Sequence, residues 1–176
     1  TGSSLTKTSA PLSFQLGNLQ FEAGESEKAI EAFEKAIELH PNFRDAHRNL
    51  AVTYVQEGDF ENAEELLVRA IELGAQDGLT FGLLGYVHLN HERYQAALQA
   101  YRMAQVTMPE EAQWRFGEAQ CLLALDSIKE ASVLYRQLLE KNPTGKAIWL
   151  NQADAFMQLD QPVYAIANLE FVHRLG

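Results

Sequence analysis

Small and large apolar side chains alternate with polar ones along this chain in a pattern that repeats every 34 residues. Alanine returns five times at that interval, at Ala29, Ala63, Ala97, Ala131 and Ala165. When the repeats are counted from residues 10, 44, 78, 112 and 146, this alanine is at repeat position 20, and a large apolar residue follows at position 24. The position-24 residues are Phe33, Leu67, Tyr101, Tyr135 and Leu169. A small residue lets two helices approach closely, and a large one fills the space between neighbouring helix pairs. The pattern therefore predicts five copies of one helical unit.

Each repeat is predicted to contain two helices of about 12–14 residues joined by a short turn. The first helices are expected near residues 12–23, 44–57, 78–91, 112–125 and 146–159, and the second helices near residues 26–39, 60–73, 94–107, 128–141 and 162–175. Asp59 and either Asp126 or Ser127 are expected to cap second helices, and Pro162 suits a first helical turn. Residues 74–78 contain no proline to stop the preceding helix, so this joint is predicted to be looser than the others.

Two stretches of the first repeat carry a recognisable motif: Leu16-Gly17-Asn18, and residues 29–41 with the sequence AIEAFEKAIELHP. Together with the 34-residue interval, they resemble the tetratricopeptide-repeat family, and the resemblance extends over residues 10–176. It implies an all-α fold, a right-handed α-α superhelix (solenoid) of about five helix–turn–helix units. The expected repeats are residues 10–43, 44–77, 78–111, 112–145 and 146–176, with further repeats expected beyond them. Residues 1–9, which are rich in Ser and Thr, are expected to be a disordered leader or the remnant of a tag.

The net charge of the chain is −10, and the acidic excess is concentrated in the first two repeats. Residues 10–77 carry fourteen acidic and five basic side chains, whereas residues 78–176 carry ten and eight. The sequence has no basic stripe, so binding to nucleic acid is not expected. No apolar run approaches the roughly 18–20 residues that cross a bilayer. The chain is therefore expected to be soluble, with the choice between cytoplasm and periplasm left open.

The residue types that carry most enzyme chemistry are present but scattered. His88 and His91 have helical spacing, but a zinc site needs three or four convergent ligands, and the histidine at repeat position 11 is expected in the core. The sequence contains no phosphate-binding loop, nucleophile elbow or His-Glu-x-x-His motif. Cys121 is expected to be a small buried residue rather than a reactive thiol. The sequence therefore predicts neither an enzyme nor a bound metal or cofactor.

In the tetratricopeptide family, residues of the first helices at repeat positions 2, 5, 6, 9, 12 and 13 line a concave face. The resemblance therefore implies a binding surface formed by Phe14, Asn18, Phe21, Asn49, Val52, Val55, Leu79, Tyr86, Leu89, Gln120, Leu123, Asn151 and Met157. This surface combines apolar side chains with amides, which suits an extended peptide whose side chains enter pockets while the amides bind its main chain. The position-12 residues, such as Leu89 and Met157, are equally suited to packing against neighbouring repeats.

One subclass of the family holds the acidic C-terminal tails of chaperones through a clamp of lysine, arginine and asparagine side chains. This chain has Asn18 and Asn49 at two clamp positions, but it has Phe14, Leu79 and Leu83 at positions that need a cation. A carboxylate would lose its hydration there without gaining a positive partner. A carboxylate clamp is therefore not predicted.

The sequence is interpreted as a protein–protein interaction scaffold whose partner is a protein or peptide of unknown identity. Two alternatives remain open: a bacterial secretion chaperone of the tetratricopeptide type, and the substrate-selecting arm of a larger enzyme. The last predicted helix carries the apolar residues Phe171, Val172 and Leu175 near its end, and no capping helix follows it. This surface is expected to be covered by further repeats or by a second copy of the chain, which would give a homodimer through the uncapped C-terminal helix.

Overall fold

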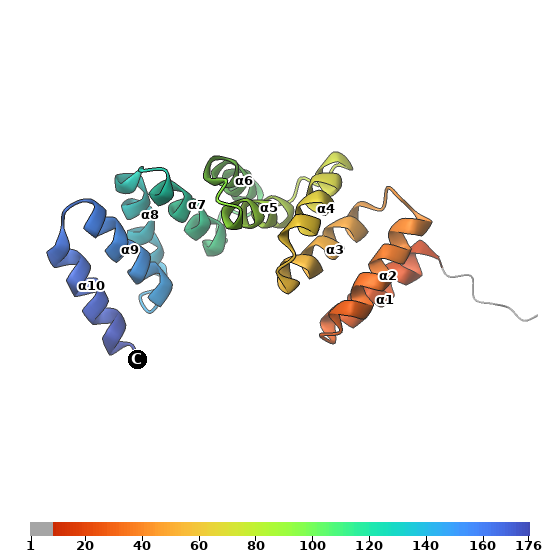
Figure 1. The fold of residues 1–176 in the computed structure, drawn as a ribbon, viewed down its shortest axis with the longest axis horizontal. Coiled ribbons are helices and arrows are strands. Elements are labelled where there is room, and N and C mark those ends of the chain that lie inside the picture. The colour runs from red at the N-terminus through yellow and green to blue at the C-terminus, as the bar shows by residue number, and fades with distance from the viewer. Residues whose placement is uncertain (1–8) are drawn as a thin grey trace, which may run out of the picture. The chain divides into compact units, whose positions relative to one another are not determined.

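The computed structural model describes residues 9–176, and this part of the chain consists of ten helices without a β-strand (Figure 1). The first helices of the five repeats are α1 (Ala10–Glu22), α3 (Arg44–Glu57), α5 (Gly78–Asn90), α7 (Ala112–Ala124) and α9 (Lys146–Gln158). The second helices are α2 (Ser26–Leu39), α4 (Phe60–Glu72), α6 (Tyr94–Thr107), α8 (Ile128–Lys141) and α10 (Pro162–Arg174). The predicted number, order and spacing of the helices are confirmed.

The first helix begins at Ala10 rather than near residue 12. Ser9 is its N-cap, and the Ser9 hydroxyl oxygen accepts a hydrogen bond from the Leu12 backbone N–H at 3.4 Å. Pro11 lies in the first turn, where its missing N–H costs no helical hydrogen bond. Ser9 therefore belongs to the start of α1, and the rest of the predicted leader, residues 1–8, lies outside the described residues.

The chain divides into two compact units, one ending at Val87 and the other beginning at His88. In the first unit α1 packs on α2, α2 on α3, and α3 on α4. In the second unit α6 packs on α7, α7 on α8, α8 on α9, and α9 on α10. Figure 1 shows the first unit in red to yellow and the second in green to blue. Each unit is thus built by helices that pack on their neighbours in the sequence.

The two periodic apolar positions form the core, as the pattern predicts. All five alanines of position 20 are 0% exposed. At position 24, the side chains of the first four repeats are at most 2% exposed, whereas Leu169 of the last repeat is 48% exposed. Leu67 shares a cluster with Ala51, Ala63 and Val87. The helices can approach closely because these positions hold alanine where two helices meet.

Glycine at repeat position 8 of the first repeat allows an especially close contact. A Cβ atom placed on Gly17 would lie 2.6 Å from Cε1 and 2.7 Å from Cδ1 of Phe33. Phe33 is the position-24 residue of the same repeat and is 1% exposed. The aromatic ring therefore lies directly on the backbone of α1, and any side chain at residue 17 would displace it.

The turn between the two helices of each repeat uses a left-handed residue at repeat position 15. The φ angles are +75° at Gly24, +78° at Gly58, +57° at Glu92, +63° at Asp126 and +55° at Asp160. Glycine adopts this conformation without steric cost, whereas the other three residues carry a Cβ atom that disfavours it. The turn geometry is therefore the same in all five repeats although its residue is not.

Three predictions concern the starts of second helices. Asp59 caps α4 by accepting a hydrogen bond from the Asn62 N–H at 3.2 Å, and Pro162 lies in the first turn of α10, so both predictions are confirmed. The predicted side-chain cap of α8 is wrong. Ser127 occupies the N-cap without a capping hydrogen bond, and Asp126 is the left-handed turn residue.

The segment without a proline, residues 74–78, is held by a cap of its own. The Asp77 carboxylate accepts hydrogen bonds from the Thr80 N–H at 2.9 Å and from the Thr80 hydroxyl at 2.8 Å, and it lies 3.5 Å from the Arg48 guanidinium. Burial alone would raise the pKa of Asp77, but the Thr80 hydrogen bonds and the Arg48 charge outweigh it and lower that pKa. Asp77 therefore caps the start of α5 and links it to Arg48 of α3.

Candidate functional site

A pocket of about 210 Å³ lies in the first unit, between residues of α1, α2, α3 and α5. Its lining residues are Asn18, Phe21, Phe33, Asn49, Val52 and Leu79. The sequence predicted five of these six as members of the concave surface. It missed Phe33, which was assigned to packing alone. The structure thus brings together side chains from repeat positions 2, 6, 9 and 12 of three consecutive repeats, and the buried Phe33 ring supplies a further wall.

Two asparagines in the pocket wall are joined across neighbouring repeats. The Asn49 side-chain amide donates a hydrogen bond to the Asn18 side-chain oxygen at 2.8 Å. Arg48 approaches the same group, with its Nε 3.5 Å from the Asn49 oxygen. The Arg48 charge is compensated, because its guanidinium also lies 3.8 Å from Asp45 and 3.5 Å from Asp77. The pocket therefore presents apolar surface and amides next to a cation that already has two carboxylate partners.

The other predicted residues of the first unit lie around this pocket or in the packing beside it. The Phe14 ring packs at a tilt against the rings of Phe33 and Phe43, with centroids 5.9 and 4.9 Å away. Val55 is half-buried against the cluster that contains Leu67. Tyr86 is 42% exposed, and its ring lies edge-on to Phe60 with centroids 5.8 Å apart. Phe14 and Val55 therefore act mainly in packing.

The predicted residues of the second unit differ widely in exposure. Leu123 is buried, Leu89, Gln120 and Asn151 are half-buried, and Met157 is 56% exposed. The Asn151 side-chain amide donates to the Ala147 carbonyl oxygen at 2.8 Å, within its own helix. Of the position-12 residues here, Leu123 serves the packing, and Met157 presents its side chain to solvent.

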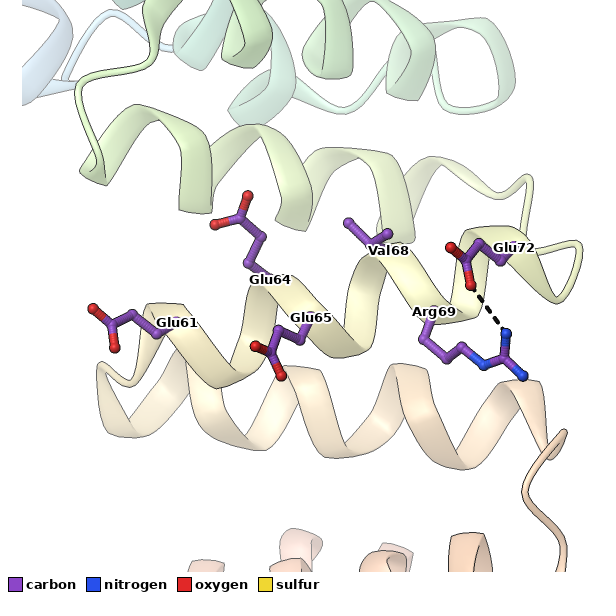
Figure 2. Close-up of a pocket in the computed structure, with 6 residues that line it drawn as sticks. All are labelled: Glu61, Glu64, Glu65, Val68, Arg69 and Glu72. Carbon is purple, nitrogen blue, oxygen red and sulfur yellow. Dashed lines mark hydrogen bonds and ion pairs between the residues drawn. The ribbon is translucent and has the colours of Figure 1, made fainter.

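A larger hollow of about 610 Å³ lies over the outer side of α4. It is lined by Glu61, Glu64, Glu65, Val68, Arg69 and Glu72. Figure 2 shows that all six side chains project from this one helix, and Arg69 donates to Glu72 at 3.0 Å. Because a single helix lines it, this hollow is an open acidic surface and not an enclosed site. The smaller pocket, which is lined by residues of four helices, is the better candidate.

The chemistry of the remaining residues gives no second site. Cys121 is 0% exposed, as predicted, and burial together with the Glu118 charge raises the pKa of its thiol to about 12. His88 is half-buried in α5. Within residues 9–176, no three histidine, cysteine, aspartate or glutamate side chains converge as metal ligands. Among the ten described helices, none has both the length and the apolar character needed to traverse a bilayer.

Helix pairs that recur every 34 residues around position-20 alanines define an α-helical repeat protein. The family model described as the cytochrome c-type biogenesis protein H TPR domain matches residues 14–115. This match covers more than half of the chain, and the chain therefore belongs to this family of tetratricopeptide-repeat domains. Its architecture is that of a protein–protein interaction scaffold.

The chain is also similar in sequence to parts of much longer proteins. The chain is 28% identical over 160 residues to the protein CTR9 homolog of Arabidopsis thaliana, covering 84% of this chain and 14% of that protein. It is 24% identical over 177 residues to human protein O-mannosyl-transferase TMTC3, covering 92% of this chain and 19% of that protein. The chain thus spans less than a fifth of the length of these two relatives.

A solved structure confirms the predicted fold class. The structure of YrrB, a TPR protein described as having an unusual peptide-binding site, superimposes with a TM-score of 0.85 at 22% sequence identity. The match covers 94% of this chain and 86% of that one. The all-α tetratricopeptide fold inferred from the 34-residue interval is therefore correct.

Proposed function

We propose that the chain binds an extended, largely apolar peptide segment of a partner protein, and that the pocket of the first unit receives one of its side chains. The observation that carries this proposal is the joining of Phe21, Phe33, Val52 and Leu79 in one pocket with an asparagine pair in its wall. A scaffold needs such a combination of apolar pocket and directed polar groups to hold a peptide in one register.

The size and lining of the pocket suit one apolar side chain. A volume of about 210 Å³ is equivalent to the share of roughly seven liquid water molecules, which is enough for a branched aliphatic or aromatic group. Burying such a side chain contributes about 1.5–3 kcal/mol. One pocket alone therefore gives weak binding, and the rest of the affinity has to come from the peptide main chain and flanking contacts.

The two asparagines are suited to the main chain of the peptide. Each carboxamide offers both a donor and an acceptor, as a peptide group does. The bond between Asn18 and Asn49 fixes both side chains before a ligand arrives, which reduces the entropy lost on binding. An extended strand that alternates side chains between the pocket and solvent would place its N–H and C=O groups within reach of them.

The charge around the pocket disfavours an acidic ligand. Arg48 is already paired with Asp45 and Asp77, and residues 10–77 carry fourteen acidic side chains against five basic ones. A carboxylate that entered the pocket would lose hydration without a free cation to replace it. The ligand class that fits is therefore an apolar segment and not an acidic tail.

Two comparisons bear on the proposal. The likeness to a TPR protein with a peptide-binding site supports peptide binding as the type of function. The similarity to an O-mannosyl-transferase extends over 19% of that enzyme, and the side chains brought together here are apolar and amide groups. We therefore propose that this chain acts by binding and not by catalysis.

The test is selection of ligands from a randomised library of peptides about nine residues long, which extend over roughly 30 Å. Selected sequences are expected to carry apolar residues at alternate positions, with dissociation constants in the micromolar range, about −8 kcal/mol. Binding of a selected peptide should weaken at least tenfold in Asn49→Ala and in Val52→Asp. Gln56→Ala is the matched control, because it removes an exposed amide from the same helix.

Selection of acidic peptides whose binding weakens steeply with salt would contradict the proposed ligand class. Selected apolar peptides that bind Val52→Asp as tightly as the unchanged protein would show that the ligand lies elsewhere on the scaffold. Circular dichroism of each variant separates a lost contact from a lost fold.

A further inference from the structure

The repeats of this chain pack on one another through the same repeat positions. At the joints, the position-24 residue of one repeat meets a residue at position 3, 7 or 10 of the next. The observed pairs are Phe33 with Leu50, Leu67 with Val87, and Tyr101 with Trp114. The last pair is stacked, with ring centroids 6.3 Å apart. Each joint therefore has two different halves, a position-24 half and a position-3/7/10 half.

The α1 helix presents the second of these halves, and no helix among the described residues covers it. Leu12, Leu16 and Leu19 stand at positions 3, 7 and 10 of the first repeat, and they are 50%, 49% and 64% exposed. In the second repeat the same positions are at most 3% exposed, because α2 packs on α3 there. We call these three leucines the α1 face. They occupy positions that are buried at the joints between repeats, but here they are exposed to solvent.

The α10 helix presents the first half in the same uncovered state. Leu169 at position 24 is 48% exposed and Ile166 is 54% exposed. Phe171 is partly covered, because its ring packs on Trp149 with centroids 4.9 Å apart. The exposed apolar side chains of α10 extend from Val163, which is 75% exposed, to Phe171, which is 37% exposed. Among them, Ile166 and Leu169 lie about one helical turn apart, and we call these two residues the α10 face.

We propose that the α10 face of one copy of the chain binds the α1 face of a second copy, head to tail, as one repeat binds the next. A second copy is the expected partner because the contact would continue the pattern of the internal joints. The α10 face carries a position-24 residue, the α1 face carries residues of positions 3, 7 and 10, and these two kinds of surface meet inside the chain. At each of the three joints described, the position-24 residue meets a residue of position 3, 7 or 10 and not another position-24 residue. This favours a contact between an α10 face and an α1 face over a symmetric contact between two α10 helices. In a dimer joined by one such contact, one α1 face and one α10 face remain uncovered, so further copies can add to form a ring or a filament. This proposal is independent of the peptide pocket.

Sedimentation velocity of the full 176-residue chain tests the proposal over a range of concentrations. The weight-average mass is expected to rise from the monomer mass of 19.7 kDa by more than roughly twofold, without a plateau at the dimer. Leu16→Glu blocks the α1 face and Leu169→Glu blocks the α10 face, and each variant alone is expected to remain monomeric. An equimolar mixture of the two should form a heterodimer and nothing larger, because each variant keeps the face that the other has lost.

Val106→Glu is the control, because Val106 is 75% exposed on α6 and belongs to neither the α1 face nor the α10 face, and this variant should assemble like the unchanged protein. A chain that stays monomeric at every concentration would overturn the proposal. Dimers of Leu16→Glu alone would show a symmetric contact through α10 instead, and a mixture that stays monomeric would show that the two faces do not meet.

Discussion

The contact between Gly17 and Phe33 makes a sharp prediction about the packing inside a repeat. Gly17→Ala adds one Cβ atom that would lie 2.6 Å from the nearest ring atom of Phe33. Carbon atoms in contact are normally about 3.5–4.0 Å apart, so the ring has to move by roughly 1 Å. Phe33 is 1% exposed, and the free space beside its ring is the pocket whose wall it forms.

The magnitude follows from two opposing effects. Overpacking of a filled core costs about 1–3 kcal/mol. Alanine is about 1 kcal/mol more favourable than glycine inside a helix. Gly17→Ala is therefore expected to destabilise the first repeat by about 1 kcal/mol, although the same substitution in an exposed helix would stabilise it.

A second substitution tests whether the ring is the cause. In the second repeat the same two positions hold Ala51 and Leu67, which share one cluster. Phe33→Leu alone is expected to cost about 1 kcal/mol as a modest change of core volume. The double variant Gly17→Ala with Phe33→Leu copies the pair of the second repeat, and its stability should be no lower than that of Phe33→Leu. This corresponds to a favourable coupling of at least about 1 kcal/mol.

Hydrogen exchange of the α1 and α2 amides is the suitable assay, because repeat chains can open locally before they unfold. A loss of 1 kcal/mol corresponds to about fivefold faster exchange in these helices. The reasoning is refuted if Gly17→Ala exchanges as slowly as the unchanged protein, or if the effects of the two substitutions simply add.

Three further outcomes are expected. Asp77→Ala should cost about 0.5–2 kcal/mol in denaturant titration near neutral pH. Because the folded state lowers the pKa of Asp77, this difference should be present above the unfolded-state pKa and disappear as pH falls through the folded-state pKa. Ala63→Leu should cost roughly 1–3 kcal/mol by overpacking, whereas Glu65→Gln on the same helix should stay within about 0.5 kcal/mol of the unchanged protein in the same titration. Cys121, whose thiol has its pKa raised to about 12, should react with a thiol reagent at pH 8 only after unfolding in guanidinium.

The fold could be predicted from the sequence because the same core positions recur in all five repeats. A single alanine such as Ala63 says little about its surroundings, but five alanines at one interval leave few alternatives to closely packed helix pairs. Local details were harder to predict. Ser127 fails as a cap because capping depends on a side-chain rotamer and on the turn before it, neither of which periodicity records.

For the candidate site too, the sequence predicted which residues take part but not the contacts between them. Repeat positions identified Asn18 and Asn49, but they could not show that the two amides bond to each other, because that depends on a contact between helices of different repeats. Phe33 was missed because a residue that fills a core was assumed not to line a pocket. The glycine at residue 17 was the available signal, since it brings the ring close to α1.

The left-handed turns offer a route to a more heat-resistant protein. Glu92, Asp126 and Asp160 hold backbone conformations that cost a residue with a Cβ atom roughly 1–2 kcal/mol, whereas Gly24 and Gly58 hold them freely. Glycine at the three strained positions is expected to gain about 0.5–1 kcal/mol each after its greater freedom in the unfolded chain is subtracted. The three turns are a repeat apart, so the gains should add, and a triple-glycine variant should melt several degrees higher in a thermal scan. None of the three residues lines the pocket, so the tolerance of the scaffold to heat can be changed separately from what it binds.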